Sequence, residues 1–426
     1  MYKRQEHGLS DTEVRELLAE GLGRLDLEGS RVLVVIPDGT RTAPIGLFFG
    51  LLGDLLGSKV VALDYLIALG THPPMDDAAK GRLLETTVVE GMAGSSRIFN
   101  HRWERPETFA TLGTIPASEV AAATDGKLEI DIAVRLNQLV GDEDGNTPYD
   151  HILVCGPVFP HEVAGFSGGN KYFVPGVAGQ EVIDATHWAG ALVTSRGLIG
   201  VRETPVRRLI ERAASFIPTP SSLIALVMHG QDLRGVFVGG MEDAWRAATE
   251  LSAELDIVWV DRPFKRVLSV MPEMYDDLWT GAKGMYKLEP AVADGGEVVI
   301  YAPHITEVSY VHGRYLDQIG YHVRDYFVAQ WEKFEHIPWG VLAHSTHLRG
   351  DGTYVAGVEK PRIRVTLSTG IPRERCEAIG LGYLDPARVE TEEWTDREDE
   401  GILLVRRAGE QLYRVKGDHH FLEEER

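Results

Sequence analysis

The chain has 426 residues, of which 44% are hydrophobic and 25% are charged, and this balance is typical of an ordinary globular protein that folds in water. Its formal net charge of −21 would repel a phosphate backbone, so the composition argues against a nucleic acid as the main partner. The two cysteines, Cys155 and Cys376, indicate no disulfide framework.

A chain of this length usually divides into two domains. We place the first domain at residues 1–262 and the second at 263–390, and we expect the acidic segment 391–426 to pack back on the first domain. The first residues lead into a polar helix start and not into an apolar signal core, and no 18 consecutive residues are all apolar. We therefore expect a cytoplasmic protein without membrane contact.

The first 90 residues follow a strand–helix pattern. A capping box formed by Ser10 and Glu13 opens a helix whose apolar residues recur at helical spacing up to Leu25. Two continuous apolar runs, residues 31–37 and 59–69, predict buried parallel strands. Each is followed by a predicted helix, the first over residues 42–55 and the second from about residue 76. A third buried strand is predicted at residues 151–158.

Polar side chains follow each of these three strands. Asp38 and Arg41 come after the first strand, His72 after the second and His161 after the third. In open α/β sheets, ligands bind outside the carboxyl ends of the strands. Any one of these histidines alone would more often be a structural residue, but their equivalent positions favour a common binding crevice.

The segment 156–187 carries the densest group of candidate residues. Gly168 and Gly169 precede Lys171, and two histidines, His161 and His187, flank the lysine. Glycine lets a backbone approach a ligand closely because it has no Cβ. The run GFSGGNK is not a Walker loop, and HEVAG is not a zinc-protease motif because it has no second histidine.

The remaining pattern predicts further helices at residues 180–193, 204–216 and 241–255, with a strand at 222–228. A second group of strands is predicted at 267–271, 297–302, 340–343 and 363–367, and a helix near Thr280 would carry Lys283. The fold class is therefore α/β, with two α/β domains, largely parallel sheets and an active-site cleft between them. The turn-rich stretch 141–146 predicts a surface turn.

Several other histidines lie outside these motifs. His101 is expected near the crevice without a chemical role. Four histidines of the second half have spacings that fit no zinc template: His304, His312, His344 and His347. We expect them on the surface or in contact with ligand-binding residues, and not as metal ligands themselves.

Four runs together resemble the nickel-dependent lactate racemase family: DGTR at 38–41, GTH at 70–72, PHEVAGFSGGNK at 160–171 and ATH at 185–187. Their order and spacing agree with that family over most of the chain. The resemblance implies a nickel-pincer nucleotide, pyridinium-3,5-bisthiocarboxylic acid mononucleotide nickel, attached covalently to Lys171. His187 then matches the histidine that completes the nickel coordination. Separate maturation enzymes, which the resemblance implies as partners, assemble this cofactor.

The resemblance also implies the reaction, racemisation or epimerisation of a 2-hydroxy acid by reversible hydride transfer through a 2-keto acid. His72 and His161 match the paired acid–base histidines, and the pKa of imidazole suits both roles. Arg41 would bind the substrate carboxylate, and Lys283 would stabilise the developing charge on oxygen.

Other positions of the resemblance concern the cofactor and the pocket wall. Asp38 would hold Arg41 or the ribose of the nucleotide, and Gly168 and Gly169 would allow backbone contact with it. Thr280 stands where lactate racemases carry glutamine, and Asn170 where arginine is usual; Pro73 and Pro74 follow His72 where a basic residue often does. We therefore expect a small-molecule 2-hydroxy acid other than lactate, longer or bulkier, as the substrate.

Two other functions remain open from the residues. One is a zinc-dependent hydrolase in which His72, His101, His161 and His187 bind the metal and Asp38 or Glu162 acts as the base. The other is a non-catalytic protein that binds a nucleotide or metallocofactor in the same cleft. Metal analysis, intact mass and turnover would separate the three.

Overall fold

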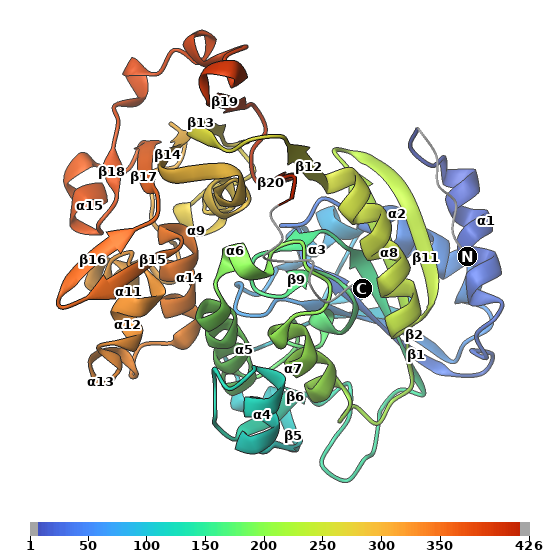
Figure 1. The fold of residues 1–426 in the computed structure, drawn as a ribbon. Coiled ribbons are helices and arrows are strands. Elements are labelled where there is room, and N and C mark those ends of the chain that lie inside the picture. Colours follow the sequence, from blue (N-terminus) through green and yellow to red (C-terminus); the bar gives the residue numbers. More distant parts are fainter. Residues whose placement is uncertain (1–6, 418–426) are drawn as a thin grey trace. The chain divides into compact units, whose positions relative to one another are not determined.

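The computed structural model describes residues 7–417, which divide into two compact units (Figure 1). The first unit contains residues 1–159, 166–186 and 205–255, and the second contains residues 160–165, 187–204 and 256–426. Each unit is thus assembled from several segments of the chain. The domains expected from the sequence were contiguous, and their boundaries at 262 and 390 stay predictions.

The first unit is built on a seven-stranded sheet with the order β11-β10-β7-β1-β2-β4-β3. Its central strands β10, β7, β1, β2 and β4 are parallel, and the outer strands β11 and β3 pair antiparallel with their neighbours. The strands span β1 Arg31–Pro37, β2 Ala62–Ala68, β3 Met92–Ala93, β4 Ser96–Asn100, β7 His151–Pro157, β10 Ser221–His229 and β11 Asp232–Gly240. The predicted strands at 31–37, 59–69, 151–158 and 222–228 are confirmed.

Helices cover this sheet. α1 begins with the expected capping box, in which Ser10 and Glu13 satisfy each other's backbone N–H groups, and it lies beside β11 (Figure 1). The helices of this unit span α1 Asp11–Leu22, α2 Ile45–Leu56, α3 Asp77–Leu84, α4 Ala117–Ala123, α7 Pro205–Ala214 and α8 Met241–Asp256, the last ending just past the unit's boundary. A separate antiparallel pair, β5 Phe109–Ile115 and β6 Ile132–Asn137, and the exposed turn at 142–146 complete it.

The second unit is built on a five-stranded, fully parallel sheet with the order β18-β17-β14-β13-β19. Its strands span β13 Phe264–Val270, β14 Val292–Ala302, β17 Arg364–Thr369, β18 Gly382–Tyr383 and β19 Ile402–Val405. Two smaller pairs accompany it: β12 Ile257–Val260 with β20 Leu412–Val415, and the hairpin β15 Gly352–Val355 with β16 Val358–Pro361. The described part of the acidic segment thus contributes β19 and β20.

The strand predicted at 340–343 is wrong. These residues belong to α14, Trp339–Arg349, in which Val341 to Leu348 are all buried. A short apolar run that is buried all round does not show the alternation of a half-buried strand, and four residues cannot distinguish a strand from a buried helix.

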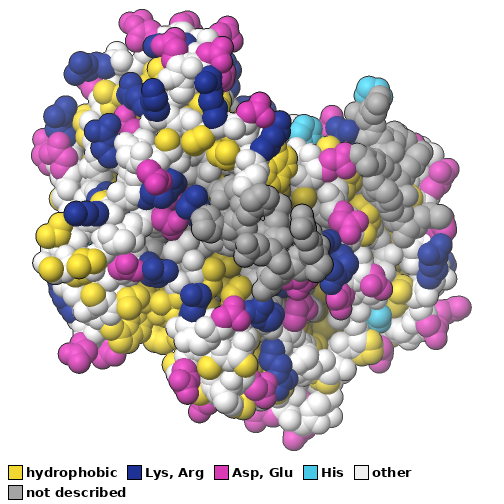
Figure 2. Space-filling view, in the orientation of Figure 1, with side chains coloured by type: hydrophobic (Ala, Val, Ile, Leu, Met, Phe, Trp, Pro, Cys, Tyr) yellow, Lys and Arg dark blue, Asp and Glu magenta, His cyan; other side chains and the backbone are white. Residues whose placement is uncertain are grey.

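The other helices of the second unit are short. They span α6 Ser195–Leu198, α9 Leu278–Gly281, α10 Lys283–Tyr286, α11 Gly313–Ile319, α12 Arg324–Val328, α13 Trp331–Phe334 and α15 Arg373–Ala378. α5, Gln180–Val193, continues from the first unit into the second. Acidic and basic side chains are interspersed over the face that Figure 2 shows, without a large basic patch on that face.

Candidate functional site

In the first unit, Asp38 and His72 form one hydrogen-bonded pair. Nδ1 of His72 lies 2.5 Å from Oδ2 of Asp38. Asp38 is buried, which by itself raises the pKa of its carboxyl, but the hydrogen bond and charge of His72, the charge of Arg41 and a bond from Thr40 outweigh this and hold the pKa well below its usual range. Asp38 is therefore a carboxylate that accepts the Nδ1 proton of His72, which leaves Nε2 of a neutral His72 ring as a base.

The loop after β1 fixes this carboxylate. Thr40 donates to Oδ1 of Asp38 from its amide at 3.1 Å and from its hydroxyl at 2.6 Å. Arg41 donates to the Thr40 hydroxyl at 3.2 Å, and its guanidinium lies 5.9 Å from the ring centre of Phe159. The hydrogen bonds of Asp38 are with His72 and Thr40, and Arg41 acts on it through charge. A contact between Asp38 and a ribose stays a prediction.

The glycines before Lys171 are required by the fold itself. Gly168 and Gly169 have φ values of +77° and +59°, which favour glycine. A Cβ on Gly168 would lie 2.5 Å from Val158, and one on Gly169 would lie 3.0 Å from Trp245. Lys171 follows in the short 3₁₀ helix η2, Gly169–Tyr172, and its side chain is half-buried.

The same loop presents unpaired amides. Within residues 7–417, the backbone N–H groups of Gly168, Gly169 and Asn170 have no hydrogen-bond acceptor. Successive amides in a turn of positive φ make a concavity that binds anions. This part of the first unit is therefore suited to a phosphate group.

His101 has a structural role. It is fully buried, its Nε2 lies 3.2 Å from the carbonyl of Ala178, and its Nδ1 lies 3.2 Å from the amide of Asn137. Burial lowers the pKa of His101 to about 4, so the ring is neutral. Because both nitrogens are used, His101 cannot serve in the four-histidine zinc site considered above, and it does not line a crevice.

In the second unit, His161 lies in the two-residue strand β8, Pro160–His161, and is buried. Its Nδ1 accepts the backbone N–H of Val163 at 3.1 Å, and Oε2 of Glu162 lies 3.3 Å from the same nitrogen. A nitrogen that accepts the Val163 proton cannot also donate to Glu162, so in the neutral ring the proton lies on Nε2. His161 and His72 thus carry opposite tautomers, one with a protonated Nε2 and one with a basic Nε2.

His187 is half-buried on α5, and its charge acts on His347 of α14. His347 and His344 are both buried, which excludes the surface positions expected for them. Burial, mainly, lowers the pKa of each to about 3, so both rings are neutral. Neither ring nitrogen of His347 has a hydrogen-bond partner among the residues that the structure describes.

The segment that carries Thr280 and Lys283 is packed by aromatic rings. Trp279 stacks on His344 at 3.9 Å between ring centres, and Nε2 of His344 lies 3.0 Å from the Trp279 carbonyl. The hydroxyl of Thr280 donates to Oδ1 of Asp277 at 2.9 Å. The ammonium of Lys283 lies 4.8 Å from the ring centre of Tyr275.

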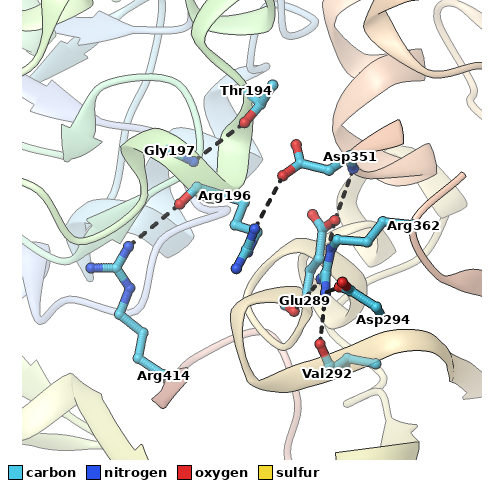
Figure 3. Close-up of polar contacts among 9 residues, drawn as sticks. All are labelled: Thr194, Arg196, Gly197, Glu289, Val292, Asp294, Asp351, Arg362 and Arg414. Carbon is cyan, nitrogen blue, oxygen red and sulfur yellow. Dashed lines mark hydrogen bonds and ion pairs between the residues drawn. The ribbon is translucent and has the colours of Figure 1, made fainter. Parts of the chain in front are cut away.

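Another part of the second unit contains a buried cluster of charged side chains around Glu289 (Figure 3). The carboxylate of Glu289 is 1% exposed, accepts the backbone N–H of Asp351 at 2.8 Å and lies 3.5 Å from the guanidinium of Arg362. Arg362 also donates to the carbonyls of Glu289 and Val292, each at 2.7 Å. Burial, with the charge of Asp351 next, raises the pKa of Glu289 to about 7.

Within residues 7–417, no group of three or more His, Cys, Asp or Glu side chains is arranged so that it could hold a metal ion. None of the helices described is long and apolar enough to cross a membrane.

Comparison with known proteins shows similarity to lactate racemases. Residues 11–198 match the lactate racemase N-terminal domain. A lactate racemase from Thermoanaerobacterium thermosaccharolyticum is 27% identical over 285 residues, which cover 65% of this chain and 60% of that relative. The N-terminal part of the chain is thus similar to lactate racemases. The chain matches somewhat less than two thirds of the length of that racemase.

Two solved structures share the fold of this chain. A crystal structure of a Thermotoga maritima protein is 32% identical, with a TM-score of 0.86 over 97% of this chain and 100% of that one. The lactate racemase apoprotein from Thermoanaerobacterium thermosaccharolyticum shares the fold, with a TM-score of 0.71 and 18% identity over 96% of this chain and 94% of that one. The mixed α/β fold with a large, largely parallel sheet is therefore confirmed.

The expected site residues are divided between the two units. The first unit holds Asp38, Arg41, His72 and Lys171, and the second holds His161, His187, Thr280 and Lys283. Their convergence on one cleft involves both units and stays a prediction. Sequence reasoning missed the tautomer-setting contacts of both histidines, because a backbone N–H such as that of Val163 leaves no signal in the sequence.

Proposed function

We propose that this protein is a racemase or epimerase of a 2-hydroxy acid that uses a nickel-pincer nucleotide tethered to Lys171. The observation that carries the proposal is the 2.5 Å contact between Asp38 and His72, because it presents a basic Nε2 on the first of the two expected acid–base histidines. The opposite tautomer of His161 supports a two-base reaction. In the proposed reaction one group takes the hydroxyl proton and the other gives a proton back to the same oxygen.

The residues present fit the cofactor that the family implies. The free amides of Gly168, Gly169 and Asn170 suit its phosphate, and Lys171 follows them directly. A neutral imidazole is the form that ligates a metal, and His187 would supply it. When bound, the nickel-pincer nucleotide would supply the acceptor and donor for the α-hydrogen of the substrate.

The protein's own residues would do the rest. Arg41 would bind the substrate carboxylate with its two-pronged guanidinium. Nε2 of His72 would accept the hydroxyl proton as the carbonyl of a 2-keto acid forms, and Lys283 would stabilise the charge on that oxygen. The Nε2 proton of His161 would then return to the oxygen when the opposite enantiomer forms. In the reverse direction the two histidines exchange roles.

The substrate is proposed to be larger than lactate. Thr280 stands where lactate racemases carry glutamine, and threonine is the shorter side chain. The hydroxyl of Thr280 donates to Asp277, so it already has a hydrogen-bond partner within the protein. Trp279 and His344 add a rigid aromatic surface beside it.

The test is an intact-mass and nickel measurement on protein co-expressed with the cofactor-building enzymes, followed by chiral chromatography of single enantiomers of a 2-hydroxy acid panel. We expect a mass increment on the peptide containing Lys171, about one nickel per chain, and interconversion of at least one acid larger than lactate. Loaded protein that inverts no acid would refute the racemase. Full activity in the Lys171→Ala variant would refute the tether.

A further inference from the structure

Two buried side chains, those of Arg207 and Trp245, donate hydrogen bonds to three consecutive backbone carbonyls in the loop that precedes Lys171. The guanidinium of Arg207, on α7, donates to the carbonyl of Phe166 and to that of Gly168 at 3.3 Å. The indole N–H of Trp245, on α8, donates to the carbonyl between them, that of Ser167, at 2.8 Å. All these residues belong to the first unit.

The two side chains also hold each other. Arg207 is 2% exposed, Trp245 is 4% exposed, and the guanidinium lies 4.2 Å from the indole ring centre, within cation–π distance. A fully buried guanidinium is costly unless its donors are satisfied. Two backbone carbonyls are among its acceptors, and the carboxylate of Glu211, one helical turn away, lies 3.6 Å from Nη1.

The planar peptide groups connect the carbonyls that Arg207 and Trp245 hold with the backbone amides of the following residues. Because each carbonyl points away from the N–H of the next residue, fixing the carbonyls of Ser167 and Gly168 also fixes the amides of Gly168 and Gly169. Those amides have no acceptor among the described residues. The side chain of Asn170, whose amide extends the same row, donates to Glu211.

We propose that Arg207 and Trp245 are positioning residues: they hold the carbonyls of 166–168 and thereby fix the amides of Gly168 and Gly169 as a preorganised site for a phosphate monoester, which the amide of Asn170 extends. The proposal rests on the proposed function for the identity of the nucleotide that carries this phosphate. Neither side chain touches the reacting atoms. Their contribution is to remove the conformational cost of ordering a glycine-rich loop when the ligand binds.

The test uses the full chain purified without cofactor and two probes, nicotinate mononucleotide and its phosphate-free riboside. Calorimetry gives the affinity of each, and their ratio isolates the phosphate. We expect wild type to prefer the mononucleotide, and Trp245→Phe, which loses one hydrogen bond but keeps an aromatic ring, to reduce the ratio roughly threefold to tenfold. Arg207→Lys, which keeps the charge but loses the two-pronged geometry, should reduce it at least as much.

Arg208→Lys is the matched control. Arg208 lies on the same helix but donates to the carbonyl of Ala123 and to Asp125. Its variant should keep the wild-type ratio. Thermal unfolding, measured in parallel, shows whether each variant is folded at the assay temperature; if Arg207→Lys is not, Trp245→Phe decides.

Two results would overturn the inference: a wild-type chain that binds both probes equally, or a folded Trp245→Phe variant with the full wild-type ratio. Neither depends on turnover. If the chain prefers the phosphate probe but inverts no acid, the proposed racemase activity is refuted and the positioning role stands. If the chain is an active racemase but does not prefer the phosphate probe, the positioning role is refuted and the racemase activity stands.

Discussion

Asp38 and His72 are joined by a hydrogen bond of 2.5 Å between Oδ2 and Nδ1, and this pair determines which nitrogen of His72 is a base. The carboxylate stays ionised because its pKa is depressed, so it remains an acceptor for the Nδ1 proton of His72 at neutral pH. In Asp38→Asn the side-chain amide could hydrogen-bond either tautomer of His72 and would carry no charge. We expect kcat of the cofactor-loaded protein to fall roughly 10²- to 10⁴-fold, the range typical of general acid–base catalysis.

The measurement for Asp38→Asn is steady-state interconversion of the preferred acid, with nickel content and circular dichroism recorded on the same sample. Thr40→Val is the control, because it removes the hydroxyl that donates to Asp38 and accepts from Arg41 but leaves the bond between Asp38 and His72, so an effect on Arg41 would appear in KM. A correctly folded, nickel-loaded Asp38→Asn variant with wild-type kcat would show that the pair has no catalytic role.

His101 should behave as a structural residue. His101→Asn removes the ring that joins Ala178 and Asn137, so we expect a loss of about 1–3 kcal/mol in the free energy of unfolding. Because the folded pKa of about 4 lies below the usual value, wild-type stability should fall as the pH drops from about 6.5 towards 4. Urea titrations at several pH values measure both effects. An unchanged stability with a complete loss of activity would place His101 in the active site instead.

Glu289 should make the protein less stable as the pH rises. Its pKa is raised to about 7, so between the unfolded value near 4.5 and pH 7 the folded state keeps a proton that the unfolded state releases. This should cost on the order of 2–3 kcal/mol of stability across that window. The charged groups around Glu289 are Asp351, Arg362 and Arg196 (Figure 3).

Glu289→Gln tests this directly, because the amide keeps an oxygen for the N–H of Asp351 but cannot ionise. Thermal unfolding at pH 5 and pH 8 should show a smaller decline for the variant than for wild type. Equal declines in the two proteins would mean that Glu289 is ionised throughout and that another group is responsible.

Gly350 packs directly against the same carboxylate. Its φ is +82°, and a Cβ there would lie 2.6 Å from Oε1 of Glu289. Gly357, in the β15–β16 turn, has a similar φ of +80° but no atom within 4 Å of an added Cβ. Both alanine variants carry the cost of positive φ, about 1–2 kcal/mol. We expect Gly350→Ala to lose clearly more unfolding free energy in urea titration, and equal losses would contradict the packing argument.

The sequence predicted the central strands and helices of the first unit because continuous apolar runs and capping signals are local properties. It also placed Asp38, His72 and His161 after the ends of predicted strands, because the strand boundaries and the residue types that follow them can be read directly from the sequence. It failed at 340–343, where a buried helix has no alternating face, and it left open whether His344 and His347 lie on the surface or inside. It could not find Arg207 or Trp245, because their partners are backbone carbonyls about 40 and 80 residues away, a relationship set by tertiary packing alone.

Thr280 should control substrate size. Its hydroxyl donates to Asp277, and its neighbour Trp279 stacks on His344, so under the proposed function a substrate would meet a short residue here. Thr280→Gln restores the longer side chain of lactate racemases and should lower kcat/KM for the preferred larger acid by about tenfold relative to lactate, since one or a few methylene groups in a pocket discriminate by this order. Thr280→Val keeps the size and removes the bond to Asp277, so its ratio of the two kcat/KM values should stay near wild type. The measurement is kcat/KM for both acids in the three loaded proteins. If Thr280→Val shifts the ratio as much as Thr280→Gln, the hydroxyl and not the length of residue 280 determines the preference.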